Sequence, residues 1–588
     1  MTEKDKPDFV KLSDLAEAVE DGQSIGVGGL HFVRIPVALL KALVASRRKD
    51  LAYVSWGGGL PLELLLAAGA IRKIVFCFSS LDMFGLAPLF RKALEDRAVE
   101  IEEWTALAMI QGFHAAQQKL PSLPFQLPIG SDMLDRSPFV RTFPDPYTEQ
   151  LMGAARRLEL DAFLLHAQRA DEDGNVEIQG ARGLDLNALG AAKKVLVTVE
   201  EIVPRGTFQT GPRAAVVPRT LVSAIARCPS GAYPTSCLPY YVTDYRALLD
   251  ATARVPIQVP EPALDRSAFV KQAAGLQPSA ISHRALVDHS PRIELDAPAS
   301  VDELMVTCLA RHYGNDSVCA AGAVSPLAIV SYLLAKRLHA HKLVLMTMSS
   351  GFVDVAVRPM LIMLAEAVDF RTAVLHCGGE DTYHWYYQPG LVTHEVVTAA
   401  QIDRYGRTNN LEITTPSGAV IRLPGQGGMA DVANTHRNFL LYLTRHSPRT
   451  LVANVDHVSA ARGLVADEER AAAGWQPGYV RLVTNLGMFE LNKESGLLEL
   501  CSILPGVSLD QVAKATGFPL SVAPKLSVMD PPKREELAVL RTEIDPLGIR
   551  RLEFVPGRER AALIAELIDR EESAIAQMAA PVPGEAKR

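Results

Sequence analysis

The chain of 588 residues repeats one pattern at about half its length. Residues 20–59 read as an acidic turn, a strand, a loop rich in glycine, a proline, an apolar helix, a basic stretch and a second strand that ends in glycine. Residues 315–351 follow the same order. Self-similarity of this kind indicates that one supersecondary unit is built more than once. We therefore expect two similar halves.

Strand-like apolar runs alternate with longer helical patterns through most of the sequence, which favours an α/β fold with largely parallel sheets. The halves are separated by a stretch rich in proline and polar residues between about 255 and 300. We place the boundary near residue 295, with one domain at 1–295 and a second at 296–556. Residues 557–588 read as a charged amphipathic helix followed by a frayed tail.

Composition excludes several classes of protein. The net charge of −7 is small for this length and the basic residues are scattered, so we expect no nucleic acid and no membrane surface as a partner. The charged start and the lack of an apolar run of about 18 residues predict a soluble, cytoplasmic protein. Seven cysteines without a CxxC pair predict neither disulfides nor zinc. His339 and His341 lack a third ligand nearby, so we predict no metal site.

A proline stands where the first turn of the repeated helix should begin, at Pro36 and at Pro326. Its missing N–H costs nothing at that position. The loop before Pro36 contains Gly28 and Gly29, so backbone N–H groups and a helix N-terminus would converge there. Such a point can hold an anion. The alternative interpretation is a glycine-rich turn that only permits tight packing.

Longer strings now indicate a family. Residues 173–203 resemble the first-subunit pattern of the family I CoA-transferases of the glutaconate CoA-transferase type. Residues 399–410, 423–434 and 503–549 resemble the second-subunit pattern, in family order. The resemblance implies that both subunits are fused in one chain, as two similar α/β domains with an active-site cleft between them. It also implies an acyl-CoA substrate, coenzyme A as part of that substrate, no permanently bound cofactor, and a homodimer.

The catalytic glutamate of that family is missing from its expected place. Its transferases use a second-subunit glutamate, in a turn read roughly Glu-(Ser/Ala/Thr)-Gly, that forms an acyl anhydride and then a CoA thioester. The matching turn here is Ser349-Ser350-Gly351, and no acidic residue lies between Asp316 and Asp354. The resemblance therefore places Ser349 where the nucleophile would be, with Ser350 and Gly351 beside the bound CoA ester.

Ser349 has two interpretations. A serine can attack a thioester if a base activates it, but the product would be a stable ester instead of a shuttling anhydride. We favour the second interpretation, in which the small side chain opens room for a bulky acyl group or a water molecule.

A second branch of the family fits the missing glutamate better. Its members resemble the transferases but act as hydrolases that open the last carbocyclic ring of steroid-derived acyl-CoA compounds. The resemblance implies an acid or base from the first half, because C–C cleavage next to a carbonyl requires protons to be moved. Matching residues 100–125 place that carboxylate near Ala106, three residues after Glu103. Glu103 is our candidate, and an exposed acidic side chain is the alternative.

A second group of titratable residues lies within 376–390, where His376, Glu380, Asp381 and His384 crowd together with aromatic residues. A histidine beside a carboxylate can act as an acid or base near neutral pH. Glu380 and His384 are therefore further catalytic candidates, and a solvated loop with a satisfied histidine is the alternative. We expect His114, on a predicted helix, to be a packed core histidine.

The loop at 424–428, PGQGG, keeps the full family pattern. Only glycine lets the backbone bend with φ > 0 and come close to a ligand. Gln426, Gly427 and Gly428 are therefore candidates for binding the thioester, with the two glycine amides as donors to its oxygen.

These observations favour an acyl-CoA hydrolase that cleaves either the thioester or a C–C bond of a cyclic or β-keto acyl group. Two alternatives stay open. One is an acyl-CoA:carboxylate CoA-transferase, and the other is a non-catalytic sensor that binds acyl-CoA.

Overall fold

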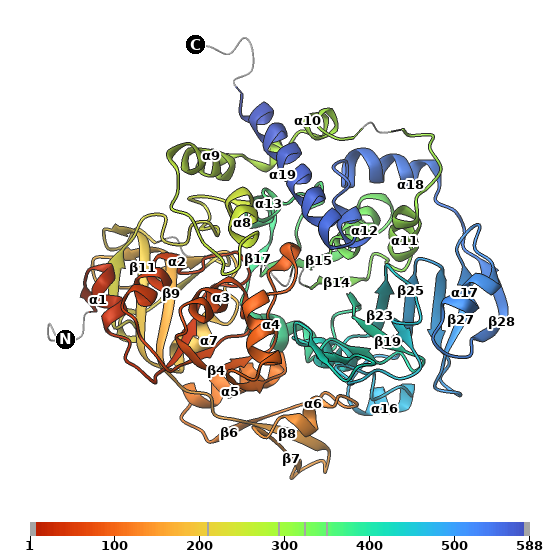
Figure 1. Cartoon of the computed structure of the whole chain (residues 1–588), viewed down its shortest axis with the longest axis horizontal. Coiled ribbons are helices and arrows are strands. Elements are labelled where there is room, and N and C mark those ends of the chain that lie inside the picture. The colour runs from red at the N-terminus through yellow and green to blue at the C-terminus, as the bar shows by residue number, and fades with distance from the viewer. Residues whose placement is uncertain (1–6, 209–210, 292–293, 323–324, 348–350, 581–588) are drawn as a thin grey trace.

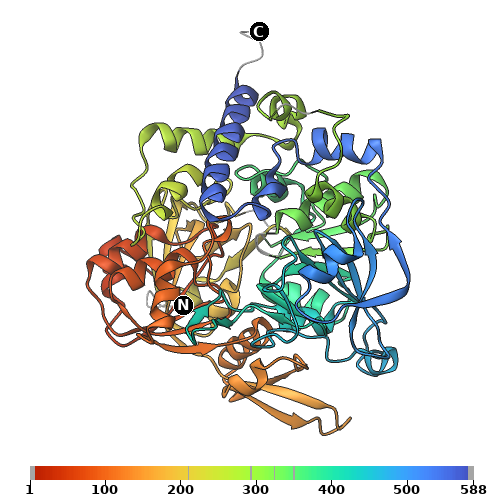
Figure 2. The ribbon, with the colours of Figure 1, turned by 45° about the vertical axis from the view of Figure 1, so that its right-hand side comes forward.

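The computed structural model describes residues 7–208, 211–291, 294–322, 325–347 and 351–580. Figures 1 and 2 show two sheet-based halves side by side, the first in red to yellow and the second in green to blue. The expected α/β fold of two similar halves is confirmed. No helix in these described ranges has both the length and the apolar character needed to cross a lipid bilayer.

The first half is built on a ten-stranded sheet whose main path is parallel throughout, in the order β1-β13-β11-β9-β2-β3-β4-β5. Its central strand β9 is buried along most of its length, as a parallel strand covered on both faces should be. The strands of this sheet are β1 (Asp8–Phe9), β2 (Ser24–Val27), β3 (Leu51–Val54), β4 (Ile71–Phe76), β5 (Glu100–Glu103), β9 (Leu160–Asp171), β10 (Val176–Gln179), β11 (Ala192–Val203), β12 (Ala214–Val217) and β13 (Ala224–Arg227).

The second half is built on another ten-stranded sheet, in the order β17-β16-β15-β14-β18-β23-β25-β26-β27-β28. Its centre, from β15 to β25, is parallel. The strands are β14 (Val318–Ala321), β15 (Val344–Thr347), β16 (Phe352–Val353), β17 (Leu375–His376), β18 (His394–Thr398), β23 (Asn438–Leu443), β25 (Val480–Thr484), β26 (Gly487–Leu491), β27 (Leu498–Ile503) and β28 (Ser521–Val528).

The internal repeat appears as matching strand–helix–strand units. β2 and β3 pair in parallel around α2 (Val37–Ala45), and β14 and β15 pair in parallel around α12 (Pro326–Leu338). Pro326 is the first residue of α12, and Pro36 directly precedes α2. The boundary predicted near residue 295 falls between β13 and β14, the last strand of one sheet and the first of the other.

Helices cover the sheets and connect the halves. The long C-terminal helix α19 packs against α8, α9 and α10, at the top of Figures 1 and 2. The helices are α1 (Leu12–Glu17), α2 (Val37–Ala45), α3 (Gly59–Ala67), α4 (Pro88–Glu95), α5 (Ala106–Gln117), α6 (Met133–Arg136), α7 (Asp185–Gly190), α8 (Tyr245–Thr252), α9 (Leu264–Gly275), α10 (His283–Asp288), α11 (Val301–Ala310), α12 (Pro326–Leu338), α13 (Ala365–Thr372), α14 (Gly379–Thr382), α15 (Met429–Thr435), α16 (Asp467–Ala472), α17 (Leu509–Ala515), α18 (Arg534–Val539) and α19 (Gly557–Ala579).

Three smaller sheets complete the structure. One of them, β6-β8-β7, projects from the first half at the bottom of Figures 1 and 2. Their strands are β6 (Ser122–Phe125), β7 (Val140–Pro144), β8 (Leu151–Arg156), β19 (Gln401–Asp403), β20 (Thr408–Asn409), β21 (Glu412–Thr414), β22 (Val420–Arg422) and β24 (Leu451–Val452).

Candidate active site

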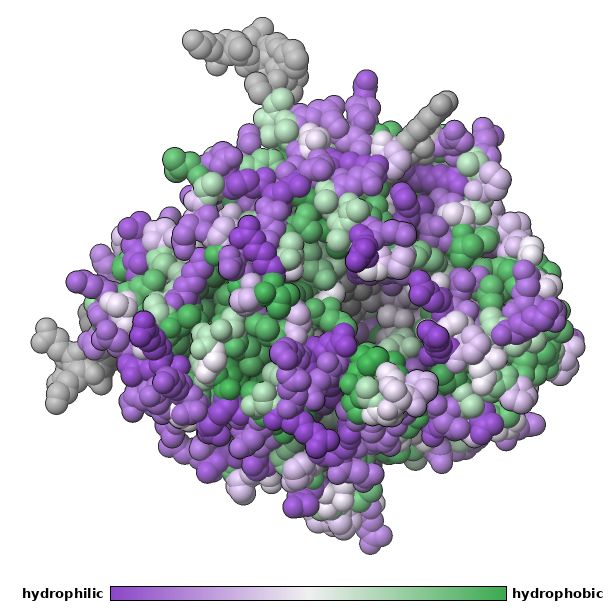
Figure 3. Space-filling view, viewed as in Figure 1, coloured by the Kyte–Doolittle hydropathy of each residue, from purple (hydrophilic) through white to green (hydrophobic). Residues whose placement is uncertain are grey.

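A cavity of about 600 Å³ lies between the two halves. Both halves form its walls, so neither half alone could make it. This face of the molecule is hollowed between the halves in the space-filling view of Figure 3. The cavity has the size expected of a small-molecule site. Residues that matter below are His31, Phe78 and Asp82 from the first half, and Tyr383, Glu395 and Gln426 from the second.

The PGQGG loop forms part of the cavity wall and is held by the first half. The N–H of Ser79 donates to the carbonyl of Pro424 at 2.7 Å. Gly427 has φ of +59°, as predicted, whereas Gly428 has φ of −95°, so the predicted positive φ is wrong there; Gly425, for which none was predicted, has +102°. A Cβ on Gly425 would lie 2.7 Å from the carbonyl oxygen of Cys77. The backbone of this loop therefore comes close to the first half of the chain, and not to a ligand.

One predicted amide donor of this loop is already used. The N–H of Gly427 donates to the carbonyl of Cys77 at 3.1 Å, so in this structure it is not free for a thioester oxygen. Gly428 has a different environment, because a Cβ there would lie 2.0 Å from the hydroxyl oxygen of Tyr383. The tyrosine hydroxyl thus packs directly over Gly428.

Polar atoms without partners line the same wall. Neither Oε1 nor Nε2 of Gln426, nor the hydroxyl of Tyr383, has a hydrogen-bond partner in the part of the chain that the structure describes, and all three atoms are buried. Buried polar atoms are almost always paired. Gln426 and Tyr383 both line the cavity, but these three atoms are themselves covered, so a side-chain rotation has to turn Gln426 Nε2 or the Tyr383 hydroxyl toward a ligand before it can donate. Gln426 was a predicted binding residue, whereas Tyr383 was not.

Glu395 is a buried carboxylate in the cavity wall, on β18. Its Oε2 accepts from the hydroxyl of Tyr387 at 2.7 Å and pairs with Nε2 of His436 at 3.0 Å. Its Oε1 lies 3.0 Å from the Cβ that Gly322 lacks. Sequence reasoning missed this residue. The available signal was a glutamate directly before Val396 and Val397 in a short strand-like run, since glutamate is almost never buried unless it is paired.

His31 and Asp82 form a second titratable pair in the cavity. Nδ1 of His31 lies 2.5 Å from Oδ1 of Asp82, and both side chains are largely buried. The two residues have φ of 55° and 51°. Non-glycine residues in this region are strained by about 1–3 kcal/mol and cluster at functional sites. The sequence contains no local sign of this pair, although His31 closely follows the Gly28–Gly29 loop.

A smaller cavity of about 180 Å³ adjoins the first. Its lining is largely apolar and includes Phe32, Ile329 and Leu361. His31 and Asp82 line both cavities. The pair therefore lies where a polar reacting group in the large cavity would meet an apolar group in the small one.

Glu103, the carboxylate predicted from residues 100–125, is not in the cavity lining. It ends β5, and its Oε1 accepts from a guanidinium nitrogen of Arg422 at 2.7 Å. Both side chains are buried, and Arg422 belongs to β22 of the second half. In this structure Glu103 is one partner of an ion pair between the halves, behind Gly425 in the loop.

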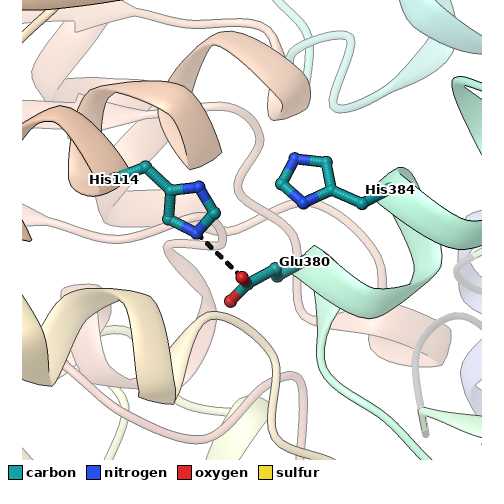
Figure 4. A group of neighbouring side chains, drawn as sticks. All are labelled: His114, Glu380 and His384. Atoms are coloured by element: carbon teal, nitrogen blue, oxygen red, sulfur yellow. Dashed lines mark ion pairs between the residues drawn. The ribbon is translucent and has the colours of Figure 1, made fainter.

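The structure brings Glu380 and His384 together with His114 (Figure 4). Nε2 of His114 lies 2.9 Å from Oε1 of Glu380. His114 was expected to pack in the core, but it is instead only partly buried and pairs across the two halves. This group does not line the large cavity. His376 is separate: its ring nitrogens pair with the carbonyls of Arg213 and Phe370, and burial lowers its pKa to about 4.

The loop with Gly28 and Gly29 was predicted to hold an anion, and in the structure it binds the carboxylate of Asp185. The N–H of Gly28 donates to the carbonyl of Leu164 at 2.8 Å, and that of Gly29 donates to Oδ1 of Asp185 at 2.9 Å. Asp185 is also paired with Arg34 at 2.6 Å. Neither amide is free for a CoA phosphate, which differs from the expectation. An internal carboxylate takes the place that a ligand anion would need.

The turn Ser349-Ser350-Gly351 stands where the family has its nucleophilic glutamate. The structure describes only its last residue, Gly351. Ser349 and Ser350 lie outside the described residues, so their predicted roles stay predictions. Gly351 has φ of +62°, and a Cβ there would lie 2.4 Å from the carbonyl oxygen of Cys377. The strand that precedes this turn, β15, pairs with β14, which in turn pairs with the strand that carries Glu395.

Comparison with known proteins agrees with this architecture. A family model described as Coenzyme A transferase matches residues 10–227 and 305–515, in both halves. The chain belongs to the coenzyme A transferase family. The resemblance inferred from the sequence is thereby confirmed.

Curated relatives of this transferase-family chain carry names of two activities. It is 31% identical over 245 residues to the A-type subunit of 3-oxoadipate CoA-transferase from Pseudomonas knackmussii, a match that covers 40% of this chain and 86% of the relative. It is 31% identical over 243 residues to the IpdA component of the cholesterol ring-cleaving hydrolase from Mycobacterium tuberculosis, covering 40% and 83%. The first relative has a transferase name, and the second has a hydrolase name.

A solved structure supports the fold of the whole transferase-family chain. The acyl-CoA transferase YdiF of Escherichia coli O157:H7 superimposes with a TM-score of 0.63 at 14% identity, covering 90% of this chain and 96% of that one. At this identity the likeness concerns the fold alone.

Proposed function

We propose that this protein hydrolyses an acyl-CoA in the cavity between its halves, with the His31–Asp82 pair activating the water. The observation that carries the proposal is this strained histidine–carboxylate pair in the wall of a cavity that also contains buried, unpartnered donors. Two sequence features agree with it. No acidic residue lies between Asp316 and Asp354, and curated relatives include subunits of a ring-cleaving hydrolase.

The pair can work as follows. Asp82 accepts a hydrogen bond from Nδ1–H of His31, which leaves Nε2 to take a proton from water. The resulting hydroxide attacks the carbonyl carbon of the thioester, and the oxygen that gains charge is held by donors in the wall. When the C–S bond breaks, the imidazolium returns its proton to the departing thiolate. The products are a carboxylic acid and free CoA.

The donors for the developing oxyanion are drawn from the second half. Nε2 of Gln426 and the hydroxyl of Tyr383 lack protein partners in the described chain, which suits them to this role. We keep the N–H of Gly428 as a further donor and leave out that of Gly427, which donates to Cys77. Arg560 of α19 also lines the cavity and offers a positive charge to a CoA phosphate.

The acyl group would extend into the adjoining apolar cavity. Ser349 keeps its proposed role as a small residue that leaves room for that group or for water. Glu103, Glu380 and His384 receive no role in the reaction, because none of them lines the cavity. If the acyl group is a cyclic or β-keto one, the same water could cleave a C–C bond instead of the thioester.

A panel of acyl-CoA substrates tests the proposal, assayed both for free thiol and for ring-opened product. The wild-type chain should release one product or the other without an acceptor acid. Release of neither from any substrate, with binding retained, would instead support the acyl-CoA sensor. Strict dependence on an added carboxylic acid would support a transferase.

A CoA-transferase is the second candidate, and one observation favours it. Glu395 places a carboxylate in the cavity, although from β18 instead of from the end of β15. Its Oε2 accepts two hydrogen bonds, while Oε1 faces Gly322. A carboxylate so placed could attack a thioester and carry CoA. Borohydride or hydroxylamine trapping of the chain during turnover tests this, with Glu395→Gln as the control.

The proposed assembly rests on the fused arrangement. Relatives are named as separate subunits of two kinds, and this chain carries both halves of the fold. We propose that it forms a homodimer, which light scattering at assay concentration would show as twice the mass of 63.7 kDa. A single-chain mass would contradict the dimer and leave the catalytic proposal intact.

A further inference from the structure

We propose that His114, Glu380 and His384 form a binding site for one divalent transition-metal ion, best matched to Zn²⁺, at the contact between the two halves. One ligand atom from each of these residues lies within 4.8 Å of the other two. Figure 4 shows the side chains approaching each other from α5 of the first half and from the segment that carries Glu380 and His384 in the second. The proposal is independent of the catalytic one.

The spacing is close to what a metal needs. Zn²⁺ binds imidazole nitrogen and carboxylate oxygen at about 2.0–2.2 Å, which puts neighbouring ligand atoms of a tetrahedral site about 3.3 Å apart. Here Nε2 of His114 and Oε1 of Glu380 are 2.9 Å apart, and the ring centres of His114 and His384 are 5.3 Å apart. Small side-chain rotations would bring all three ligand atoms around one ion. Water would fill the fourth position.

Glu380 is already oriented as a ligand. The side-chain amide of Asn187 donates to its Oε2 at 2.8 Å, which fixes the carboxylate and turns Oε1 toward His114. Outer hydrogen bonds of this kind set the geometry of metal-binding carboxylates. Nε2 of His384 is buried and has no hydrogen-bond partner within the described ranges.

The ligand types select the metal. Two imidazoles with one carboxylate suit Zn²⁺ and its first-row neighbours, whereas Mg²⁺ and Ca²⁺ prefer oxygen ligands alone. The sequence predicted no metal site because these ligands come from distant segments, and only the fold brings α5 against α14 and the π-helical turn of Tyr383–Tyr387. Two residues of that turn, Tyr383 and Tyr387, line the large cavity. A bound ion would therefore tie the cavity wall to the first half.

In a second cluster of possible metal ligands, the histidine and the glutamate already have hydrogen-bond partners within the protein. His166, Glu200 and Cys237 also lie close together, and all are buried. The two ring nitrogens of His166 pair with Thr198 and with Glu200, both at 2.9 Å. The carboxylate of Glu200 further accepts from Tyr241 and from the Ser230 amide. This network leaves no ligand atom of the His–Glu pair open, so we assign no metal to it.

Titration of the full-length, chelator-treated chain with Zn²⁺ tests the proposal by calorimetry and by melting temperature. Replacement with Co²⁺ adds a visible absorption spectrum that reports nitrogen and oxygen ligands. We expect one ion per chain, a rise in melting temperature on binding, and no rise with Mg²⁺. His384→Ala and Glu380→Gln, which keeps the side-chain volume, should each abolish binding. Asn187→Ala should weaken it about 10–100-fold.

His341→Ala is the matched control, because this histidine is exposed and lies in the His-Ala-His stretch that the sequence offers. Binding unchanged by that variant but lost in His384→Ala and Glu380→Gln supports the site. Binding that persists in both of those variants, or that disappears in His341→Ala or Cys237→Ala, would place the ion elsewhere and overturn the proposal. The absence of saturable binding would overturn it as well.

Discussion

Nδ1 of His31 lies 2.5 Å from Oδ1 of Asp82, and both residues hold left-handed backbone conformations. They are 51 positions apart in the sequence. The fold thus sustains two local strains in order to place one histidine–carboxylate pair where the two cavities meet.

Replacement of His31 by glutamine should lower kcat about 10²–10⁴-fold, the range that one general base contributes. The Michaelis constant should change little, because the imidazole acts on water and not on the CoA moiety. Asp82→Asn should also lower kcat, since it disturbs the tautomer that leaves Nε2 free. Steady-state thiol release gives both numbers. His341→Gln is the control, and an equal loss in that variant would point to a general effect.

Removal of a donor from Tyr383 or Gln426 should separate catalysis from stability. Tyr383→Phe and Gln426→Ala should each lower kcat about 10²–10³-fold, or about 2.7–4 kcal/mol of transition-state stabilisation. Neither change breaks a hydrogen bond within the described protein, so Tyr383→Phe should keep or raise the free energy of unfolding, whereas Gln426→Ala also removes buried side-chain atoms and should lower it by the cost of that cavity. Kinetics and urea unfolding measure the two effects. A large loss of stability with unchanged kcat would contradict the oxyanion role.

Glu103→Gln should lower the stability of the fold and leave kcat nearly unchanged. The variant leaves Arg422 buried without its ion-pair partner, which typically costs about 3–5 kcal/mol. Activity per folded molecule should be nearly unchanged. Unfolding and active-site titration check this, and Glu103→Leu combined with Arg422→Met should recover most of the stability. If kcat collapses while stability holds, Glu103 is the acid or base that the sequence suggested.

Asp431 predicts a pH dependence of stability. Burial raises the pKa of this carboxyl from 3.8 to about 7, against one hydrogen bond from the Leu107 N–H. Because the folded state holds the proton more tightly, its contribution to stability is present below pH about 4 and is lost as pH rises through 7. Asp431→Asn mimics the protonated form at every pH.

The free energy of unfolding of Asp431→Asn, relative to wild type, should therefore rise by more than about 1 kcal/mol between pH 4 and pH 8. Other buried carboxyls with a pKa raised to about 7, such as Glu571, are present in both proteins and cancel in the difference. Urea unfolding at several pH values measures it. A difference that is flat with pH would mean that Asp431 is ionised in the folded state.

The fold could be predicted because its signals are local and periodic. The doubled strand–helix–strand pattern predicts the two halves, and Gly427 of the PGQGG loop does adopt the positive φ expected of it, although Gly428 does not. The site could not be predicted in the same way. His31 meets Asp82, and Glu103 meets Arg422, only through crossovers between strands. Nothing in the neighbouring sequence of either residue encodes its partner.

The role of Glu395 could not be predicted from its local sequence either. Its strand reads His-Glu-Val-Val-Thr and is mostly buried, and the charge within it is explained only by the contacts of Glu395 with Tyr387 and His436. Gly28 and Gly29 show how a correct local prediction can still fail to find a ligand site. The loop does bind an anion, but the anion is the carboxylate of Asp185.

The most direct test of the central claim follows the carboxyl oxygen during turnover in H₂¹⁸O, with acid quenching, which preserves a CoA thioester, and intact-mass analysis of the chain. Hydrolysis by activated water predicts ¹⁸O in the acid product after a single turnover and a chain that never gains mass. A chain found carrying CoA, with the adduct mapped to Glu395 and lost in Glu395→Gln, would contradict the account and identify a transferase.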